Sequence, residues 1–292
     1  MNILVFGAGV LGSLYAAKLQ RAGQHVTLLA RGARLEDLRK NGIRLIDDAN
    51  GVQTTTQVEL IDQLKPDAAY DLMLVIVRKN QLPSLLPALA RNHFTPNVLF
   101  MTNNAAGPAE MISALGRHRV LLGFTGAGGA RIDKIVHYQL TSAQHTTIGE
   151  LDGSLSLRIL KIGRVLEEAG FQVAVCSNMD AWLKTHAAIV SPAANAIYMA
   201  GGDAFRLART RDALILLVRA AREGLRVLRK LGYPIIPARI RRLRCIPEPL
   251  LVAILAKGLA SETAQLMLAR HANTARDEMQ CLADEFKQLA VQ

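Results

Sequence analysis

The sequence has few of the features that mark disulfide-stapled, zinc-binding or membrane-spanning proteins. Its three cysteines, Cys176, Cys245 and Cys281, are far apart and form no Cys-x-x-Cys pair, so we predict neither a disulfide framework nor a metal site. The uncharged stretch 187–202 contains Pro192 and is shorter than the roughly 20 residues that span a membrane. The amino terminus lacks the basic start of a signal peptide. These absences favour a cytoplasmic protein that does not enter membranes.

Aromatic residues are also scarce, at 4% of the chain, whereas the chain as a whole is strongly basic. The net charge is +11, and nearly all of the excess lies in the segment 206–244, where eleven Arg and one Lys accompany only Asp212 and Glu223. Arginine clusters attract nucleic acids and acidic partners without reading a sequence. No aromatic stacking platform or recognition motif accompanies this segment, which argues against nucleic acid as a partner. We favour a solvated helix face or a subunit contact, for example in a homodimer.

A glycine-rich turn lies between two predicted strands near the start of the chain. The apolar run 3–6 predicts a strand buried on both faces, 13–19 predicts a helix, and 25–29 predicts a second strand. The turn consists of Gly7, Ala8, Gly9, Val10, Leu11 and Gly12. In a G-x-G-x-x-G turn the first glycine permits the tight turn, the second lets a pyrophosphate approach the backbone, and the third lets the helix pack closely. This context predicts dinucleotide binding at the helix start, the alternative being a glycine turn without a ligand.

The end of the second predicted strand indicates which dinucleotide binds. NAD enzymes usually place Asp or Glu there to bind the ribose hydroxyls. Here the strand is followed by Arg31, and no carboxylate appears before Glu36. A guanidinium makes charge-assisted, forked contacts with a phosphate. Arg31 therefore favours NADP (NADPH) over NAD, the alternative being a solvent-facing arginine at a strand end.

Three later predicted strands also end in polar or glycine-rich segments. The runs 72–77, 97–101 and 120–124 are followed by such segments at 78–81, 102–107 and 126–130. Ligands bind outside the carboxyl ends of the strands in open α/β sheets. We therefore expect these segments to be ligand-binding loops of one nucleotide-binding sheet.

The second half of the chain changes to helical patterns. The ranges 158–169, 178–198, 205–231 and 261–289 are predicted helices, and Pro192 is expected to kink the second of them. The 292 residues, half of them hydrophobic, are enough for one large domain or two ordinary ones. We predict an α/β fold: an N-terminal doubly wound sheet, residues 1–177, followed by an all-helical C-terminal domain, residues 178–292.

Taken together, these motifs resemble the ketopantoate reductase (2-dehydropantoate 2-reductase) family. The resemblance is carried by the turn 7–12, Arg31, Arg78-x-x-Gln81, Asn104-x-x-Gly107, Gly129-Ala130, Trp182-x-Lys184 and Glu278. It implies a Rossmann-type N-terminal domain, a helical C-terminal domain, and an NADP-dependent oxidoreductase that acts on CH–OH groups. The reaction implied is NADPH-dependent reduction of a 2-oxo acid to a 2-hydroxy acid, as in pantothenate biosynthesis.

The resemblance also implies how the cofactor is bound. The turn 7–12 would hold the pyrophosphate, and Arg31 would hold the 2′-phosphate. Arg78 stands where the family usually has Lys, which keeps the charge but changes its geometry. Asn104 would lie beside the nicotinamide and the substrate, and Ala130 would touch the cofactor through its backbone.

Two further residues carry the catalytic part of the resemblance. Lys184 would bind the substrate and protonate the new alkoxide, and Glu278 would contact cofactor and substrate. A plain surface lysine is the alternative for Lys184. His186 is an alternative acid and substrate-binding residue, against a hydrogen-bonded core histidine, and His271 shares a predicted helical face with Glu278.

Three positions depart from the family pattern. The family has Asn four and eight residues after its lysine, where this chain has Ala188 and Pro192, and Ser twelve residues before its glutamate, where this chain has Leu266. Matching Ser191-Pro192 to the family's Asn-Pro instead would put Leu183 at the lysine position. A reductase of another carbonyl substrate and a catalytically idle NADP sensor therefore stay open as alternatives.

Overall fold

The structure is a computed structural model that describes residues 1–141 and 144–291. The chain divides into two compact units. Unit 1 comprises Met1–Thr102 and Pro108–Met179, and unit 2 comprises Asn103–Gly107 and Asp180–Gln292. A five-residue loop in the first half of the sequence thus packs with the helices of the second half. The predicted division into 1–177 and 178–292 stays a prediction.

Unit 1 is built on an eight-stranded sheet, which confirms the predicted α/β class. Its strands are β1 (Asn2–Phe6), β2 (His25–Leu29), β5 (Glu59–Ile61), β6 (Leu72–Val75), β7 (Val98–Met101), β8 (Val120–Phe124), β11 (Thr146–Gly149) and β12 (Val173–Val175). The spatial order is β12-β11-β8-β7-β6-β1-β2-β5, and only the β8–β11 pair is antiparallel. Strands β6 and β7 are buried throughout, and β1 is buried from Ile3 to Phe6, as their continuous apolar runs predict.

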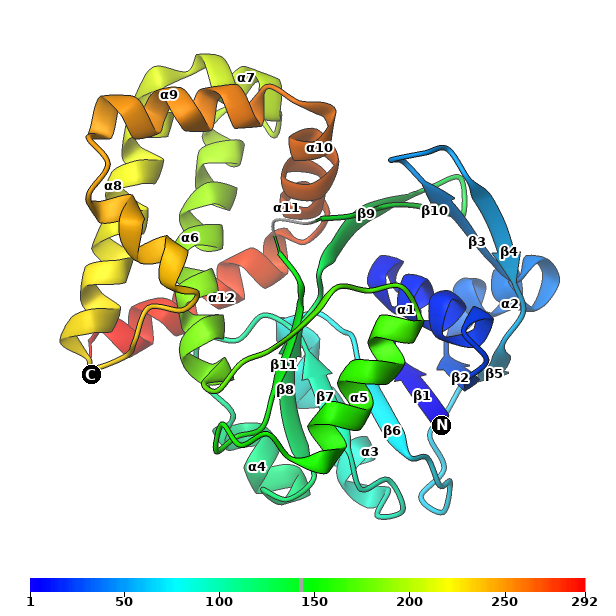
Figure 1. Cartoon of the computed structure of the whole chain (residues 1–292). Helices are drawn as coiled ribbons and strands as arrows, with labels where there is room; N and C mark the ends of the chain where they lie inside the picture. Colours follow the sequence, from blue (N-terminus) through cyan, green and yellow to red (C-terminus); the bar gives the residue numbers. More distant parts are fainter. Residues whose placement is uncertain (142–143, 292) are drawn as a thin grey trace. The chain divides into compact units, whose positions relative to one another are not determined.

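A second sheet of four strands lies over the helix that follows the glycine turn. These strands are β3 (Ile43–Asp47), β4 (Gln53–Thr56), β9 (Ala127–Ile132) and β10 (Ile135–Leu140), in the order β4-β3-β10-β9. Helix α1 (Val10–Arg21) packs between the two sheets, touching β1 and β2 on one side and the small sheet on the other (Figure 1). Their shared core includes Leu14, Tyr15 and Leu19, all fully buried.

The small sheet corrects one expectation from the sequence. Residues 126–130 were expected to form a glycine-rich ligand loop, but Ala127–Ile132 is strand β9, and Ala130 pairs with His137 of β10. The glycine pattern has a packing cause here, because a Cβ on Gly129 would lie 2.2 Å from the His137 carbonyl oxygen. Gly129 therefore allows β9 and β10 to approach closely.

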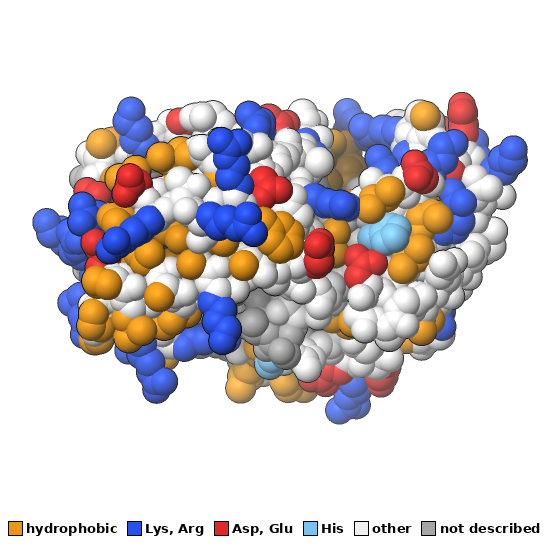
Figure 2. All heavy atoms as spheres, turned by 90° about the horizontal axis from the view of Figure 1, so that it is seen from above, with side chains coloured by type: hydrophobic (Ala, Val, Ile, Leu, Met, Phe, Trp, Pro, Cys, Tyr) orange, Lys and Arg blue, Asp and Glu red, His pale blue; other side chains and the backbone are white. Residues whose placement is uncertain are grey.

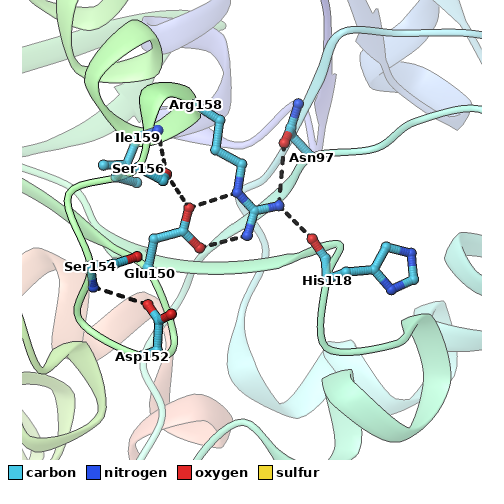
Figure 3. Close-up of polar contacts among 8 residues, drawn as sticks. All are labelled: Asn97, His118, Glu150, Asp152, Ser154, Ser156, Arg158 and Ile159. Atoms are coloured by element: carbon cyan, nitrogen blue, oxygen red, sulfur yellow. Dashed lines mark hydrogen bonds and ion pairs between the residues drawn. The ribbon is translucent and has the colours of Figure 1, made fainter.

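The remaining helices of unit 1 are α2 (Gly32–Asn41), α3 (Leu82–Arg91), α4 (Ala109–Leu115) and α5 (Leu157–Glu168). A charged network holds the start of α5 (Figure 3). Arg158 donates from Nε and Nη2 to the two oxygens of Glu150, at 2.6 and 2.5 Å, and Ser156 donates to the same carboxylate. Burial alone would raise the pKa of the Glu150 carboxyl, but the hydrogen bonds from Arg158 and Ser156 lower it.

Unit 2 is helical, as predicted. Its helices are α6 (Met179–Met199), α7 (Ala204–Arg209), α8 (Arg211–Lys230), a 3₁₀ segment (Ala238–Arg244), α9 (Glu248–Leu259), α10 (Glu262–Ala264), a π-helical turn (Gln265–Ala269), α11 (Arg270–Thr274) and α12 (Arg276–Ala290). Helix α9 packs across α7 and α8 (Figure 1).

Two of the predicted helices of unit 2 are broken. The predicted helix 205–231 is interrupted at Thr210, and the predicted helix 261–289 is interrupted at Ala275. Both residues leave helical backbone geometry, with φ −100°, ψ 83° and φ −126°, ψ 40°. Neither glycine nor proline marks these breaks, so the local pattern contains no signal for them.

Among the described residues, no single helix has the length and apolar content needed to cross a membrane. One pair, α9 with the stretch Glu262–Thr274, passes the same test of length and composition but is bent by 86°.

Candidate functional site

The turn Gly7–Gly12, called the glycine cradle below, has a backbone that only glycine allows at two positions. Gly7 has φ +119°, and a Cβ there would lie 2.4 Å from the Ile76 carbonyl oxygen. A Cβ on Gly12 would lie only 1.8 Å from the Gly7 carbonyl oxygen. Gly7 thus turns the chain tightly beside the end of β6, and Gly12 lets α1 pack on the turn.

Gly9 differs from the other two glycines because a Cβ on it would meet nothing within 4 Å. The open side of the turn is therefore at Gly9, which is also the N-cap residue of α1. No side chain caps this helix end, and its first turn, which begins with Val10 and Leu11, contains no acidic residue. Free backbone N–H groups and the positive end of the helix dipole fit an anion such as a pyrophosphate.

Two arginines of the β2–α2 connection lie near the cradle. Arg31 is exposed, is the N-cap residue of α2, and donates to the Asp62 carbonyl oxygen at 3.4 Å. Arg34 reaches back to the cradle, where it donates to the Ala8 carbonyl oxygen at 3.4 Å and to the Ser13 hydroxyl at 3.0 Å. Sequence reasoning singled out Arg31 and missed Arg34, although both follow the strand end.

Arg34 also forms an ion pair of 2.7 Å with Asp37, one turn further along α2. Burial and the nearby charge of Arg131 lower the pKa of Arg34. Arg44 lies 3.8 Å from the same Asp37 carboxylate. Positive charge thus exceeds negative charge around one side of the cradle, which suits a ligand with several phosphates.

The two cationic side chains that follow β6, Arg78 and Lys79, lie in different environments. Arg78 precedes a 3₁₀ turn, Lys79–Gln81, and is partly buried. Lys79 is almost fully buried and pairs with Glu110 in the first turn of α4. Because Gly7 packs against Ile76, the cradle and the Arg78 backbone lie at the same end of the sheet. Ala130, by contrast, lies within a strand of the small sheet.

In unit 2, Lys184 lies on α6 with its ammonium group buried. Its Nζ pairs with Asp180, one helical turn earlier, and lies 4.8 Å from the centroid of the Tyr233 ring. A Cβ built on Gly107 would lie 3.2 Å from both Lys184 Nζ and Asp180 Oδ1. The predicted lysine therefore lies against the loop Asn103–Gly107, and its charge is balanced by a carboxylate and an aromatic face.

The loop Asn103–Gly107 is held on α12. Glu285 accepts hydrogen bonds from the backbone N–H groups of Ala105 and Ala106, at 2.9 and 3.2 Å. Asn104 closes the loop internally, because its side chain donates to the Gly107 carbonyl oxygen at 2.8 Å and accepts from the Gly107 N–H at 3.0 Å. Sequence reasoning missed Glu285, since nothing in a helical pattern near the end of the chain points to a loop 180 residues away.

A second group of polar side chains in unit 2, called the polar cluster below, consists of Asn103, His186, His271 and Glu278. Asn103 Nδ2 donates to Glu278 Oε1 at 2.8 Å, and His271 Nε2 lies 3.9 Å from Glu278 Oε2. His186 stacks on Trp182, with ring centroids 5.5 Å apart. Burial and the charge of His271 lower the pKa of His186 to about 4, so that it is neutral at pH 7.

The residues that depart from the family pattern are apolar packing residues. Ala188 packs against α8, where a Cβ on Gly224 would lie 3.1 Å from its methyl group. Ala188 and Pro192 line a groove of about 350 Å³ between α6, α8 and α12. Leu266 is buried in the π-helical turn. No polar side chain replaces the family's amide and hydroxyl groups at these three positions.

The basic segment 206–244 is partly used inside unit 2. Arg219 forms a bidentate ion pair with Glu248, in which Nε and Nη2 each lie 2.9 Å from a carboxylate oxygen. Arg222 donates to the carbonyl oxygens of Leu243 and Ile246. These contacts tie α8 to the start of α9. On the face above α7 and α9, Lys and Arg side chains are dispersed among apolar ones (Figure 2). The solvated helix face or subunit contact expected for this segment stays a prediction.

The chain is similar in sequence to known 2-dehydropantoate 2-reductases. A sequence model of the family described as Ketopantoate reductase PanE/ApbA matches residues 3–153. A 2-dehydropantoate 2-reductase of Archaeoglobus fulgidus is 29% identical over 239 residues, which cover 80% of this chain and 75% of the relative.

Solved structures share the fold over nearly the whole chain. The crystal structure of 2-dehydropantoate 2-reductase from Methylococcus capsulatus superposes with a TM-score of 0.64 at 20% identity, covering 100% of this chain and 95% of the other. The ternary structure of D-mandelate dehydrogenase with NADH and anilino(oxo)acetate superposes with a TM-score of 0.72 at 14% identity, covering 99% and 98%. At these identities the likeness describes the fold alone.

Proposed function

The chain belongs to the ketopantoate reductase PanE/ApbA family, and from this premise we propose that it reduces a 2-oxo acid to a 2-hydroxy acid with NADPH. Members of the family named 2-dehydropantoate 2-reductase suggest 2-dehydropantoate, the precursor of pantoate, as the first substrate to test. The idle-sensor alternative is not favoured, because the curated relatives are reductases.

The observation that carries this proposal is the glycine cradle. Gly7 and Gly12 are fixed by close backbone approach, whereas Gly9 leaves the uncapped start of α1 open. This arrangement fits the pyrophosphate of a nicotinamide dinucleotide. Arg31 at the end of β2, with no carboxylate in its place, supports NADPH over NADH.

The chemistry divides between the cofactor and the chain. A bound nicotinamide supplies the hydride. Reduction of a carbonyl leaves a negative oxygen that must be protonated, and Lys184 is the group we assign to this step. Asp180 and the Tyr233 ring hold the Lys184 ammonium group in place, and His186 is neutral at pH 7. A protonated lysine also attracts the carboxylate of a 2-oxo acid.

The positions that depart from the family pattern indicate which kind of 2-oxo acid the chain should prefer. Ala188 and Leu266 offer no hydrogen bonds where the family has amide and hydroxyl side chains. A 2-oxo acid with an apolar substituent would lose less at such positions than one with a hydroxyl group. Ketopantoate carries a hydroxyl group, so the panel of substrates should include apolar 2-oxo acids beside it.

The test is NADPH oxidation, followed by the loss of NADPH absorbance, with a panel of 2-oxo acids. We expect turnover of at least one acid, with NADPH preferred to NADH. The absence of turnover on every acid, together with normal NADPH uptake in calorimetry, would contradict the reductase. The absence of NADPH uptake would contradict the cofactor assignment as well.

A further inference from the structure

The 3₁₀ segment Ala238–Arg244 separates apolar from basic side chains. In and just after this segment an apolar residue recurs at every third position, which is the period of a 3₁₀ helix. These residues, Ile240, Leu243 and Ile246, each pack against a hydrophobic cluster of unit 2. The arginines between them, Arg239, Arg241, Arg242 and Arg244, are exposed. The segment therefore turns its apolar side inward and its arginines outward.

The charge of these arginines is not cancelled by carboxylates. The carboxylate that follows them in the sequence, Glu248 at the start of α9, is already paired with Arg219. Among the described residues, no ion pair or hydrogen bond engages the guanidinium groups of Arg241, Arg242 and Arg244. Such groups attract anions, and their planar fork fits the oxygens of a phosphate.

Helix α9 continues this surface with apolar side chains. Leu250 and Ile254 lie one turn apart on α9 and are 54% and 51% exposed, and Lys257 is exposed one turn further on. The inner side of the same helix is apolar too, with Leu251, Val252 and Leu259 buried. A helix that is apolar on its inner and its outer side is expected to be covered on both.

The 3₁₀ segment and α9 form one continuous surface of unit 2. Residues 245–247 join them, and Arg222 of α8 holds this junction by donating to the carbonyl oxygens of Leu243 and Ile246. Figure 2 shows Lys and Arg side chains beside hydrophobic ones on the face above α7 and α9. The exposed side of Ala238–Arg244 and of α9 is called the α9 face below.

The combination of unpaired arginines with exposed apolar side chains distinguishes between possible partners. Water suits the arginines but not Leu250 and Ile254. A two-fold contact with a second copy would set the same patch against itself, so the arginines of the two copies would repel each other. DNA offers phosphates but mostly polar contacts. A bilayer with anionic headgroups suits both kinds of side chain, because its phosphates bind arginine and its acyl boundary accepts leucine and isoleucine.

We propose that the α9 face binds the surface of a membrane that contains anionic lipids. Arg241, Arg242 and Arg244 bind the headgroup phosphates, and Leu250 and Ile254 enter the boundary between headgroups and acyl chains. In this arrangement α9 lies in the plane of the interface and does not cross the bilayer. The inference goes beyond the proposed function, since it needs neither cofactor nor substrate.

The experiment is co-sedimentation of the full chain with vesicles, without cofactor or substrate. One set of vesicles is phosphatidylcholine alone, and the other also contains phosphatidylglycerol. We expect binding to the anionic vesicles only, weakened by added salt. Arg241→Gln combined with Arg242→Gln should weaken this binding roughly 30-fold. Leu250→Ser combined with Ile254→Ser should weaken it by about tenfold.

Matched control variants lie on α5 of unit 1. Lys161→Gln combined with Arg164→Gln removes the same charge from exposed positions, and Leu157→Ser combined with Leu160→Ser removes exposed apolar side chains. Both controls should bind anionic vesicles within about threefold of the wild type. Thermal melting checks the fold of each variant. Leu250→Ser alone replaces the double variant if the latter does not fold.

Several results would overturn the proposal. They include no binding to anionic vesicles, equal binding to both kinds of vesicle, and losses in the α5 controls as large as those in the α9 face. Loss in the arginine variant without loss in the Leu250 and Ile254 variant would contradict insertion into the bilayer. A wild type that ignores vesicles would assign the face to a second copy if it forms dimers that the Leu250 and Ile254 variant breaks. It would assign the face to nucleic acid if it binds DNA and the arginine variant does not.

Discussion

The glycine cradle of unit 1 and the polar cluster of unit 2 are assembled on different scales. The cradle is one continuous stretch of six residues, and its shape comes from the backbone. The polar cluster draws on a loop near residue 103, on α6, on α11 and on α12, and its shape comes from side chains. A backbone site can be recognised from local spacing, whereas a side-chain site depends on which helices pack together.

Of the predicted substitutions, the one at Lys184 in unit 2 should have the largest effect on catalysis. We expect Lys184→Met to lower kcat by about 10²–10⁴-fold, because the only assigned proton donor is lost. The affinity for NADPH should stay within about threefold of the wild-type value, since Lys184 lies outside the cradle.

Asp180→Asn is the matched variant for Lys184. It removes the charge that pairs with the lysine but keeps the ammonium group itself, so we expect a smaller loss of kcat than in Lys184→Met. Steady-state kinetics with the best 2-oxo acid compares the two. Equal kcat values for wild type and Lys184→Met would contradict the assignment of Lys184.

The cradle can be broken in two distinct ways. Gly9→Ala places a methyl group in open space, so the protein should melt like the wild type but bind NADPH about 100-fold more weakly, because the methyl group occupies the phosphate position. Gly12→Ala forces a Cβ against the Gly7 carbonyl oxygen, so we expect a loss of roughly 1–3 kcal/mol in stability. Thermal melting and calorimetry separate these effects.

The two arginines near the cradle, Arg31 and Arg34, should affect cofactor binding in different ways. We expect Arg31→Ala to weaken NADPH binding by about 10–50-fold and to leave NADH binding unchanged, because only the 2′-phosphate is lost as a partner. Arg34→Ala should weaken both cofactors, because Arg34 holds the cradle through Ala8 and Ser13. Calorimetric titration of each variant with both cofactors checks this, and equal losses in Arg31→Ala would contradict its role.

Much of unit 1 can be predicted from the sequence, and the reasons are local. Apolar runs without alternation predict central parallel strands, and glycine spacing predicts the cradle. The segment 126–130 shows where this reasoning fails, because glycines that permit strand contact look the same as glycines that permit a ligand. Only the pairing partner, His137, distinguishes the two.

Unit 2 is harder to predict, because its contacts join distant segments. The matching of family motifs indicated Lys184, Glu278 and Asn104, but not the residues that hold them in place. Glu285 and Asp180 are ordinary helical carboxylates by pattern, and their partners come from the packing of α6 and α12 around the loop.

We also predict a difference in acid stability between the two units. Burial lowers the pKa of His186 from 6.5 to about 4, so between these values the unfolded chain binds more protons than the folded one. The stability that neutral His186 contributes to unit 2 is thus present above about pH 6.5 and is lost as the pH falls toward 4, by up to roughly 3 kcal/mol.

Glu150 in unit 1 gives the contrasting case. Its pKa is lowered below the usual 4.5, so its contribution to stability is present above that value and is lost only at lower pH.

Trp182 is the only tryptophan and stacks on His186, so its fluorescence reports on unit 2. We expect the urea midpoint from fluorescence to fall between pH 6.5 and 4, and to fall less in His186→Gln. A wild-type midpoint that is flat across this range would show that His186 is not buried in its neutral form.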